Sequence, residues 1–273
     1  MTRIDVDGIR LEIQHLTPAL RNEDREARLG KPTIVFLHEG LGSVAMWRDW
    51  PQKVCNAAGC SGLVYSRRGY GQSDVIPHVR ALPDPTRPRE GRLPATYLYT
   101  EAWEVLPALL AQLGIQQPVL IGHSDGASIA LLYAARFPAA ACVVMAPHVM
   151  VEDISIAAIA QARDAFEHGT LRNSLARYHT DVDCAFWQWN DVWLSEAFRS
   201  FDIRPECALI TCPLLAIQGW DDPYGTMAQI DIISTPDGQI QLQKLEHCGH
   251  SPHRDQTALT THLIQTFLAD LGG

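Results

Sequence analysis

The sequence has no long apolar run, and its first residues lack the apolar core of a signal peptide. No stretch approaches the ~18–20 consecutive apolar residues that a membrane-spanning helix needs. The N-terminal segment MTRIDVDGIRLEIQHL carries acidic residues where a secretory signal would be apolar. These two absences predict a cytoplasmic protein with no membrane partner.

An excess of positive charge is also missing. The chain has 22 Lys and Arg against 31 Asp and Glu, a net charge of −9, and its basic residues form no stripe. Proteins that bind nucleic acid through their phosphates usually show such a stripe. We therefore expect no nucleic-acid partner, while the oligomeric state is left open.

Cysteine is present, but in no disulfide pattern. Seven cysteines at irregular spacings are typical of free thiols in a reducing compartment. One loop contains four residues that can bind zinc, His247, Cys248, His250 and His253. Zinc binding is therefore an alternative. The spacing of these four residues is tighter than that of the usual zinc-ligand patterns, so we expect neither a metal nor another cofactor.

What the sequence does contain is an alternation of apolar strands and amphipathic helices. Asp7-Gly8 between two short apolar runs predicts an N-terminal hairpin. Strands alternating with helices predict an α/β fold, with a mainly parallel sheet covered by helices on both faces. The expected strands are 33–38, 62–66, 118–121, 142–146, 213–217 and 240–245, and the expected helices are 44–58, 97–113, 126–137, 226–233 and 252–271.

One region interrupts this alternation. Residues 148–207 show helical periodicity without a convincing strand, which predicts a helical cap inserted after the sixth strand into a core of residues 1–147 and 208–273. The region contains Trp187, Trp189 and Trp193. At spacings of two and four these side chains cannot share one helical face, so we expect them to divide between core and pocket.

The strongest chemical signal is GHSDG, residues 122–126, which follows an apolar strand and precedes a helix. A G-x-S-x-G turn in this context exposes its serine at the carboxyl edge of a sheet. The glycines allow the sharp turn because the neighbouring chain leaves no room for a Cβ. Ser124 is therefore the predicted nucleophile.

A serine nucleophile needs a base that is oriented by a third group. Asp221 and Asp222 follow one predicted strand, and His250 lies in a loop after the next strand. The carboxyl ends of parallel strands meet at one edge of a sheet, so these side chains can converge on Ser124. His250 is the predicted base, and the two aspartates remain alternatives for the acid.

An oxyanion hole needs two amides that point at the developing negative oxygen. One is the amide of Asp125, directly after the nucleophile. The other is expected from the loop HEGLG, residues 38–42, where Gly40 is the predicted donor because glycine allows close approach to a substrate.

Four motifs in this order resemble those of the α/β-hydrolase superfamily, and the resemblance runs nearly from end to end of the chain. They are HEGLGS (38–43), RGYGQS (68–73), GHSDG (122–126) and CGHSPH (248–253). The resemblance implies a carboxylesterase-like serine hydrolase with a helical cap. It also implies Asp222 as the acid, since that family's acid usually stands three positions after the glycine that ends its strand, and it supports Gly40 as oxyanion donor.

Two residues depart from the family pattern. Glu39 replaces the usual glycine after His38, and we expect it to enter a structural pairing, with Arg68 as a possible partner. Asp125 replaces the usual hydrophobic residue or glutamine after the nucleophile. It is interpreted as an acid favoured at a helix start, with contact to a substrate ammonium as the alternative.

The leading functional prediction is hydrolysis of a small carboxylic ester through an acyl-enzyme on Ser124, with His250 and Asp222 completing the triad and no cofactor. The alternatives are a carbon–carbon bond hydrolase of ring-cleavage products, an amino-acid ester hydrolase, and a ligand receptor with little turnover. The first two would use the same triad, so the pocket has to distinguish them.

Overall fold

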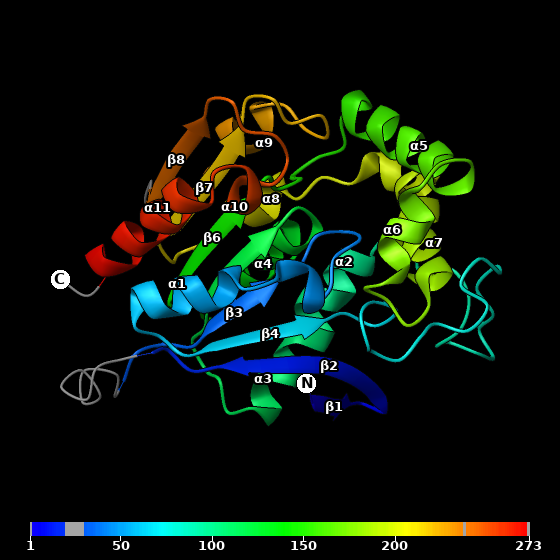
Figure 1. The fold of residues 1–273 in the computed structure, drawn as a ribbon, viewed down its shortest axis with the longest axis horizontal. Coiled ribbons are helices and arrows are strands. Elements are labelled where there is room, and N and C mark those ends of the chain that lie inside the picture. Colours follow the sequence, from blue (N-terminus) through cyan, green and yellow to red (C-terminus); the bar gives the residue numbers. More distant parts are fainter. Residues whose placement is uncertain (1, 20–29, 237–238, 272–273) are drawn as a thin grey trace.

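The computed structural model describes residues 2–19, 30–236 and 239–271, and its centre is an eight-stranded sheet (Figure 1). The strand order is β1-β2-β4-β3-β5-β6-β7-β8, and every pair from β4 onward is parallel. The predicted mainly parallel sheet is therefore confirmed. The strands are β1 (Thr2–Val6), β2 (Ile9–Leu16), β3 (Ile34–Leu37), β4 (Gly62–Ser66), β5 (Val119–His123), β6 (Ala141–Met145), β7 (Leu214–Gly219) and β8 (Ile240–Leu245).

The sheet begins with the predicted hairpin. Asp7 has φ 51° and Gly8 has φ 78°, the two left-handed conformations that a two-residue type I′ turn requires. The turn sets β1 antiparallel to β2, and β2 pairs antiparallel with β4. The hairpin thus lies at one edge, away from the strands that carry the candidate site.

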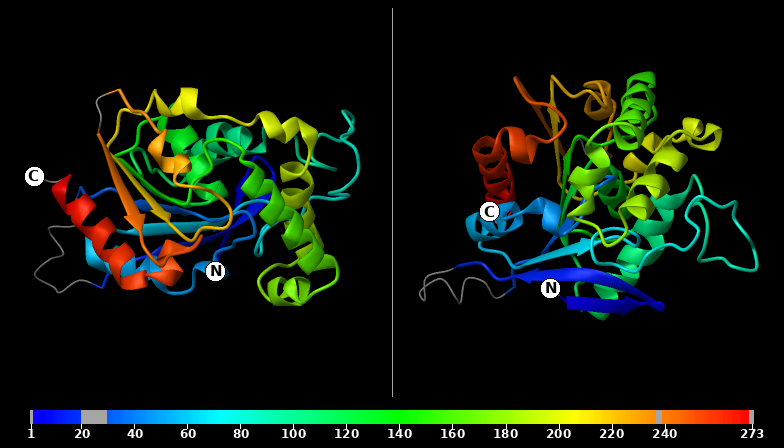
Figure 2. Two further views of the ribbon diagram at one scale, coloured as in Figure 1. Left: turned by 90° about the horizontal axis from the view of Figure 1, so that it is seen from above. Right: turned by 45° about the vertical axis from the view of Figure 1, so that its right-hand side comes forward.

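Helices cover both faces of the sheet (Figure 2). Because side chains alternate along a strand, Val35 and Leu37 of β3 belong to one hydrophobic layer, and Ile34 and Phe36 belong to the other. The first layer includes residues of α3 and α4, and the second includes residues of α1 and α11. The helices of the core are η3 (Ala45–Trp47), α1 (Trp50–Ala58), α2 (Tyr97–Thr100), the π-helical turn η4 (Glu101–Val105), α3 (Leu106–Gln112), α4 (Asp125–Ala134), α9 (Ala228–Asp231), α10 (Pro252–Asp255) and α11 (Thr257–Asp270).

Two of the predicted helices are interrupted, and the one predicted at 97–113 is continuous from Tyr97 to Gln112 but contains a π-helical turn. Arg48 has φ 55°, which separates η3 from α1, and α1 restarts with Pro51 in its first turn, where a missing amide is tolerated. Pro107 has no amide N–H to donate the regular helical hydrogen bond, and the π-helical turn η4 ends two residues before it, at Val105. Gln256 leaves helical geometry and divides α10 from α11.

The chain between β6 and β7 is helical, as predicted. It lies beyond the C-terminal ends of β3 and β4, where the arrowheads are drawn (Figure 1). Within this described stretch the only β pairing is the single bridge between Met150 and Asp202, which joins its two ends. Its helices are α5 (Asp153–Glu167), α6 (Leu171–Ala176), α7 (Val182–Trp193), η5 (Glu196–Ser200) and α8 (Arg204–Cys207).

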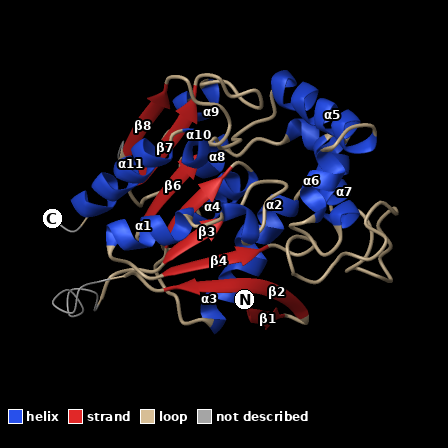
Figure 3. Cartoon of the chain, in the orientation of Figure 1, coloured by secondary structure: helices blue, strands red, loops and turns tan. Residues whose placement is uncertain are grey.

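The proline-rich segment between β4 and α2 has no regular structure and runs as a long loop beside these helices (Figure 3). Over the described ranges, no helix combines the length and the apolar character that crossing a membrane would require. All seven cysteines are buried and unpaired.

Candidate active site

Ser124 lies in a sharp turn between β5 and α4. Its backbone adopts φ 53° and ψ −119°, a conformation that non-glycine residues rarely take. A Cβ at Gly122 would collide with the carbonyl oxygen of Gly126, and a Cβ at Gly126 would collide with the carbonyl oxygen of Leu37. Both glycines are therefore required by close backbone packing. This confirms the prediction that the neighbouring chain leaves no room for a Cβ in this turn.

His250 is held by Asp222 rather than by Asp221. The Nδ1 atom of His250 lies 2.9 Å from Oδ1 and 2.8 Å from Oδ2 of Asp222. The neighbouring Asp221 is exposed, and its amide donates to the carbonyl of Cys248. Of the two aspartates left open by the residues alone, the structure thus brings only Asp222 to the histidine.

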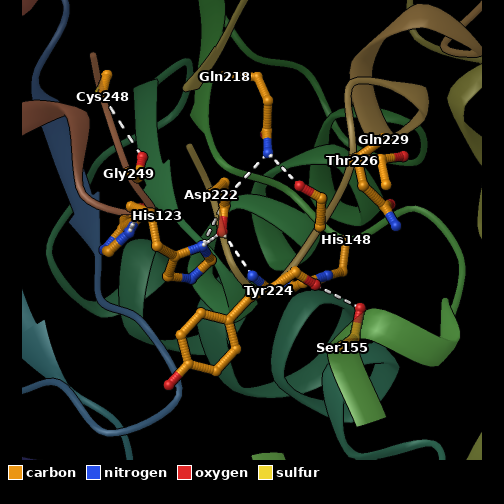
Figure 4. A network of polar contacts seen from close by, with 12 residues as sticks. His123, His148, Ser155, Gln218, Asp222, Tyr224, Thr226, Gln229, Cys248 and Gly249 are labelled. Atoms are coloured by element: carbon orange, nitrogen blue, oxygen red, sulfur yellow. Dashed lines mark hydrogen bonds and ion pairs between the residues drawn. The ribbon is translucent and has the colours of Figure 1, made fainter. Parts of the chain in front are cut away.

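Two further donors fix the Asp222 carboxylate. The amide of Tyr224 donates to Oδ1 at 2.8 Å, and Nε2 of Gln218 donates to Oδ2 at 2.8 Å (Figure 4). Burial alone would raise the pKa of Asp222, but the hydrogen bond from His250, its charge and the Tyr224 amide together lower it. The carboxylate therefore stays ionised beside the imidazole.

Ser124 and His250 both line a cavity of about 210 Å³ at the carboxyl edge of the sheet. Gly40 borders the same cavity, and α5 and α7 contribute Ile159, Trp189 and Trp193. The cavity thus lies between the sheet and the helices that connect β6 to β7.

The two predicted oxyanion donors also border this cavity. Asp125 is the first residue of α4, so its amide lies at the helix N-terminus, where negative charge is favoured. A Cβ on Gly40 would collide with the indole of Trp189. Among the described residues, neither amide donates to a protein acceptor.

The side chain of Asp125 is enclosed by protein partners. Its carboxylate is 0% exposed and accepts hydrogen bonds from Tyr97 at 2.6 Å and Trp193 at 3.2 Å. Arg67 lies 3.5 Å from the same group. These contacts favour the structural interpretation of Asp125 over contact with a substrate ammonium.

Glu39 enters a structural pairing, as expected, but Arg68 is the wrong partner. Glu39 Oε1 accepts from Arg254 at 3.1 Å, and Oε2 lies 3.5 Å from Nδ1 of His123. Arg68 instead donates to the carbonyl of Val75 at 3.3 Å, since it faces the proline-rich loop. Burial would raise the pKa of Glu39, but His123 and Arg254 hold it well below its usual value.

The three tryptophans of α7 divide as expected. Trp189 and Trp193, one helical turn apart, line the cavity. Trp187 instead stacks under Arg80, whose guanidinium carbon lies 3.6 Å from the ring centroid.

Several residues that line the cavity fall outside the predicted set, and three of them carry polar side chains from segments with no motif. These three are His148, Tyr224 and Arg254. His148 follows the end of β6 by three residues, Tyr224 follows Asp222 by two, and Arg254 lies in α10. No sequence motif identifies these residues. The first two follow the ends of strands, however, and that position alone indicates a place in the site because ligands bind at the carboxyl ends of parallel strands.

The structure does not assemble the zinc site that was raised as an alternative. In the described parts of the chain, no group of three or more His, Cys, Asp or Glu side chains is arranged to hold a metal ion. His253 instead packs against Trp47 and Trp50, and His247 is exposed.

The chain belongs to the Alpha/beta hydrolase family, whose sequence profile matches residues 34–261. An enol-lactonase from Burkholderia xenovorans is 18% identical, with a TM-score of 0.69 over 98% of this chain and 100% of that one. A thermophilic esterase from Thermogutta terrifontis is 18% identical, with a TM-score of 0.71 over 99% of both chains. A proline iminopeptidase from Mycobacterium smegmatis is 15% identical, with a TM-score of 0.66 over 99% of this chain and 98% of that one. These similarities are of fold, so the substrate has to be argued from the cavity.

Proposed function

We propose that this protein is a serine hydrolase that cleaves small carboxylic esters through an acyl-enzyme on Ser124. The observation that carries the proposal is the placement of Ser124 and His250 on one cavity, with His250 hydrogen-bonded to Asp222. A serine, a histidine and a buried carboxylate in these roles form a catalytic triad. Membership of the Alpha/beta hydrolase family supports the same chemistry.

The proposed reaction has two acyl-transfer steps. His250 takes the proton of Ser124 through Nε2 while the serine oxygen attacks the ester carbonyl, and Asp222 keeps the imidazole in the tautomer that this requires. The oxyanion accepts hydrogen bonds from the amides of Gly40 and Asp125, each worth about 3–4 kcal/mol in the transition state. The alcohol leaves with the proton from His250, and water, deprotonated by the same base, then releases the acid.

The cavity supports a small substrate. Its volume of about 210 Å³ is less than the roughly 300–1,000 Å³ of pockets for drug-sized ligands. We propose that residues 148–207 act as a cap over the core of residues 1–147 and 208–273, because Ile159, Trp189 and Trp193 of that segment line the cavity. A lactone is a cyclic ester and would react by the same steps, which the naming of one structural neighbour as an enol-lactonase makes worth testing.

Steady-state hydrolysis of 4-nitrophenyl esters from acetate to octanoate tests this function. We expect turnover that is highest for the shortest acyl chains and absent in Ser124→Ala, with a small lactone as an additional substrate. A folded wild type that turns over none of them would instead favour a ligand receptor, in which a ligand raises Tm without being consumed.

A further inference from the structure

His148 places an imidazole in the catalytic cavity that the proposed acyl-transfer steps do not use. The residue is 2% exposed and lines the cavity together with Ser124 and His250. Its ring centroid lies 5.8 Å from that of His250 and 4.9 Å from that of Trp193. A group bound next to Ser124 would therefore lie within reach of this ring.

The backbone around His148 is fixed by the core. Oγ of Ser128 donates to the carbonyl of His148 at 2.6 Å and accepts from its amide at 3.2 Å. The next amide, that of Val149, donates to Oε1 of Gln229 at 2.7 Å. Ser128 lies on α4, the helix that begins directly after Ser124, so the position of His148 is tied to that of the proposed nucleophile.

Among the residues that the structure describes, none forms a hydrogen bond with the ring of His148. Over the described residues, the hydrogen bonds of His148 involve only its backbone, and Nδ1 is buried without an acceptor or donor. Leaving a buried polar group unpaired costs about 1–3 kcal/mol, so such a group calls for an explanation. His250 cannot provide the partner through Nδ1, because that nitrogen is occupied by Asp222.

The imidazole is neutral over the ordinary pH range. Burial, followed by the nearby charge of His250, lowers the pKa of His148 to about 3. A neutral imidazole has one N–H donor and one acceptor nitrogen, so it can pair with a hydroxyl in either sense and with a keto oxygen through its N–H. It offers no charge to a carboxylate or an ammonium.

We infer that His148 binds an oxygen substituent of the substrate, a hydroxyl or a keto oxygen close to the scissile ester. This inference rests on the proposed function, since it assigns the class of ester that the same cavity takes. An ester with such a substituent offers the ring a hydrogen-bond partner where the ring borders the cavity, whereas a plain alkyl ester offers none. Sites built to hydrogen-bond a substrate discriminate strongly against the analogue that lacks the group.

The test compares three esters of similar size, ethyl butyrate, ethyl 3-hydroxybutyrate and ethyl 3-oxobutyrate, by pH-stat titration. We expect kcat/KM of wild type to be at least tenfold higher for one oxygenated ester than for butyrate. In His148→Phe that ratio falls toward one, and in His148→Gln, which keeps a donor and an acceptor, part of it remains. Tyr224→Phe, which removes the hydroxyl of another residue that lines the cavity, keeps the ratio.

Equal rates of wild type on all three esters would overturn the inference, as would a ratio that is unchanged in His148→Phe. Comparing the hydroxy ester with the oxo ester shows which substituent the ring prefers. A hydroxyl can both donate and accept a hydrogen bond, whereas a keto oxygen can only accept one. If neither His148 variant folds, the wild-type ratio still decides. Labelling of wild-type Ser124 by a fluorophosphonate does not depend on the substituent, so it distinguishes failure of this inference from failure of the proposed hydrolase.

Discussion

His123 Nε2 lies 2.6 Å from the carbonyl oxygen of His250. The opposite nitrogen of the same ring faces Glu39 at 3.5 Å, and Glu39 pairs with Arg254 at 3.1 Å. His123 precedes the proposed nucleophile, Glu39 precedes a proposed oxyanion donor, and Arg254 follows the proposed base by four residues. One network therefore joins the three loops on which the proposed chemistry depends.

Replacing Glu39 by Gln should lower kcat about tenfold, or about 1.4 kcal/mol in the activation barrier, with a smaller change in KM. The charge that orients His123 and Arg254 would be lost, and the loops would shift relative to one another. Steady-state kinetics on a short ester measures this. Asp183→Asn, which breaks the exposed ion pair with Arg172, is the control and should leave kcat unchanged. A wild-type kcat in Glu39→Gln would show that the network serves packing alone.

The adjacent aspartates offer a matched pair for the acid. Asp222→Asn keeps the shape but favours the wrong tautomer of His250, so kcat should fall by about 10³–10⁴-fold, as in other serine triads. Asp221→Asn changes an exposed neighbour and should stay within about twofold of wild type. Similar losses in the two variants would contradict the assignment of Asp222.

Asp125→Asn should destabilise the fold, because it leaves the buried guanidinium of Arg67 without its anion. We expect the free energy of unfolding in urea to fall by about 3–5 kcal/mol. Asp202→Asn, which breaks the more exposed pair with Arg204, should cost no more than about 1 kcal/mol.

The same Asp125 variant tests the alternative of an amino-acid ester substrate. The ratio of rates on an α-amino ester and its neutral analogue should not change, since the carboxylate is enclosed by Tyr97, Trp193 and Arg67. A selective loss on the α-amino ester would restore the substrate-ammonium interpretation.

Acid should destabilise the protein through buried histidines. Burial lowers the pKa values of His38, His148 and His253 below 6.5, so the unfolded chain binds protons that the folded chain does not. Their stabilisation is fully present above pH 6.5 and is lost as the pH falls below it. For His148, with a pKa of about 3, the loss between pH 7 and pH 5 is about 2 kcal/mol.

Urea unfolding at pH 7 and pH 5 measures this term. His148→Phe should reduce the pH-dependent loss by about 2 kcal/mol. His168→Phe, at an exposed histidine, should reduce it little. An undiminished loss in His148→Phe would mean that its imidazole does become protonated in the folded state.

The parts of the fold that local rules determine could be predicted from the sequence. The strand Gly62–Ser66 was expected at its observed bounds, because a short apolar run between turn residues has few other structures. The turn at Ser124 was recognisable because its glycines are required by backbone packing. The breaks at Arg48 and Gln256 were not predictable, since neither residue is a helix breaker and tertiary packing determines their backbone conformation.

The contacts between distant segments could not be predicted. Glu39 was expected to pair with Arg68, but its partners lie 84 and 215 residues away, at His123 and Arg254. His148 was assigned to the start of the cap, and only the three-dimensional arrangement places it beside His250. Sequence spacing says little about such pairs, because loop closure costs little more for a long loop than for a short one.

Labelling by a fluorophosphonate, read as intact mass on wild type, Ser124→Ala and His250→Ala, tests whether Ser124 is a nucleophile activated by His250. The probe requires an activated serine and no knowledge of the substrate. We expect one adduct on wild type, none on Ser124→Ala and greatly slowed labelling of His250→Ala. A folded wild type that stays unmodified, or an adduct that persists in Ser124→Ala, would contradict this role of Ser124.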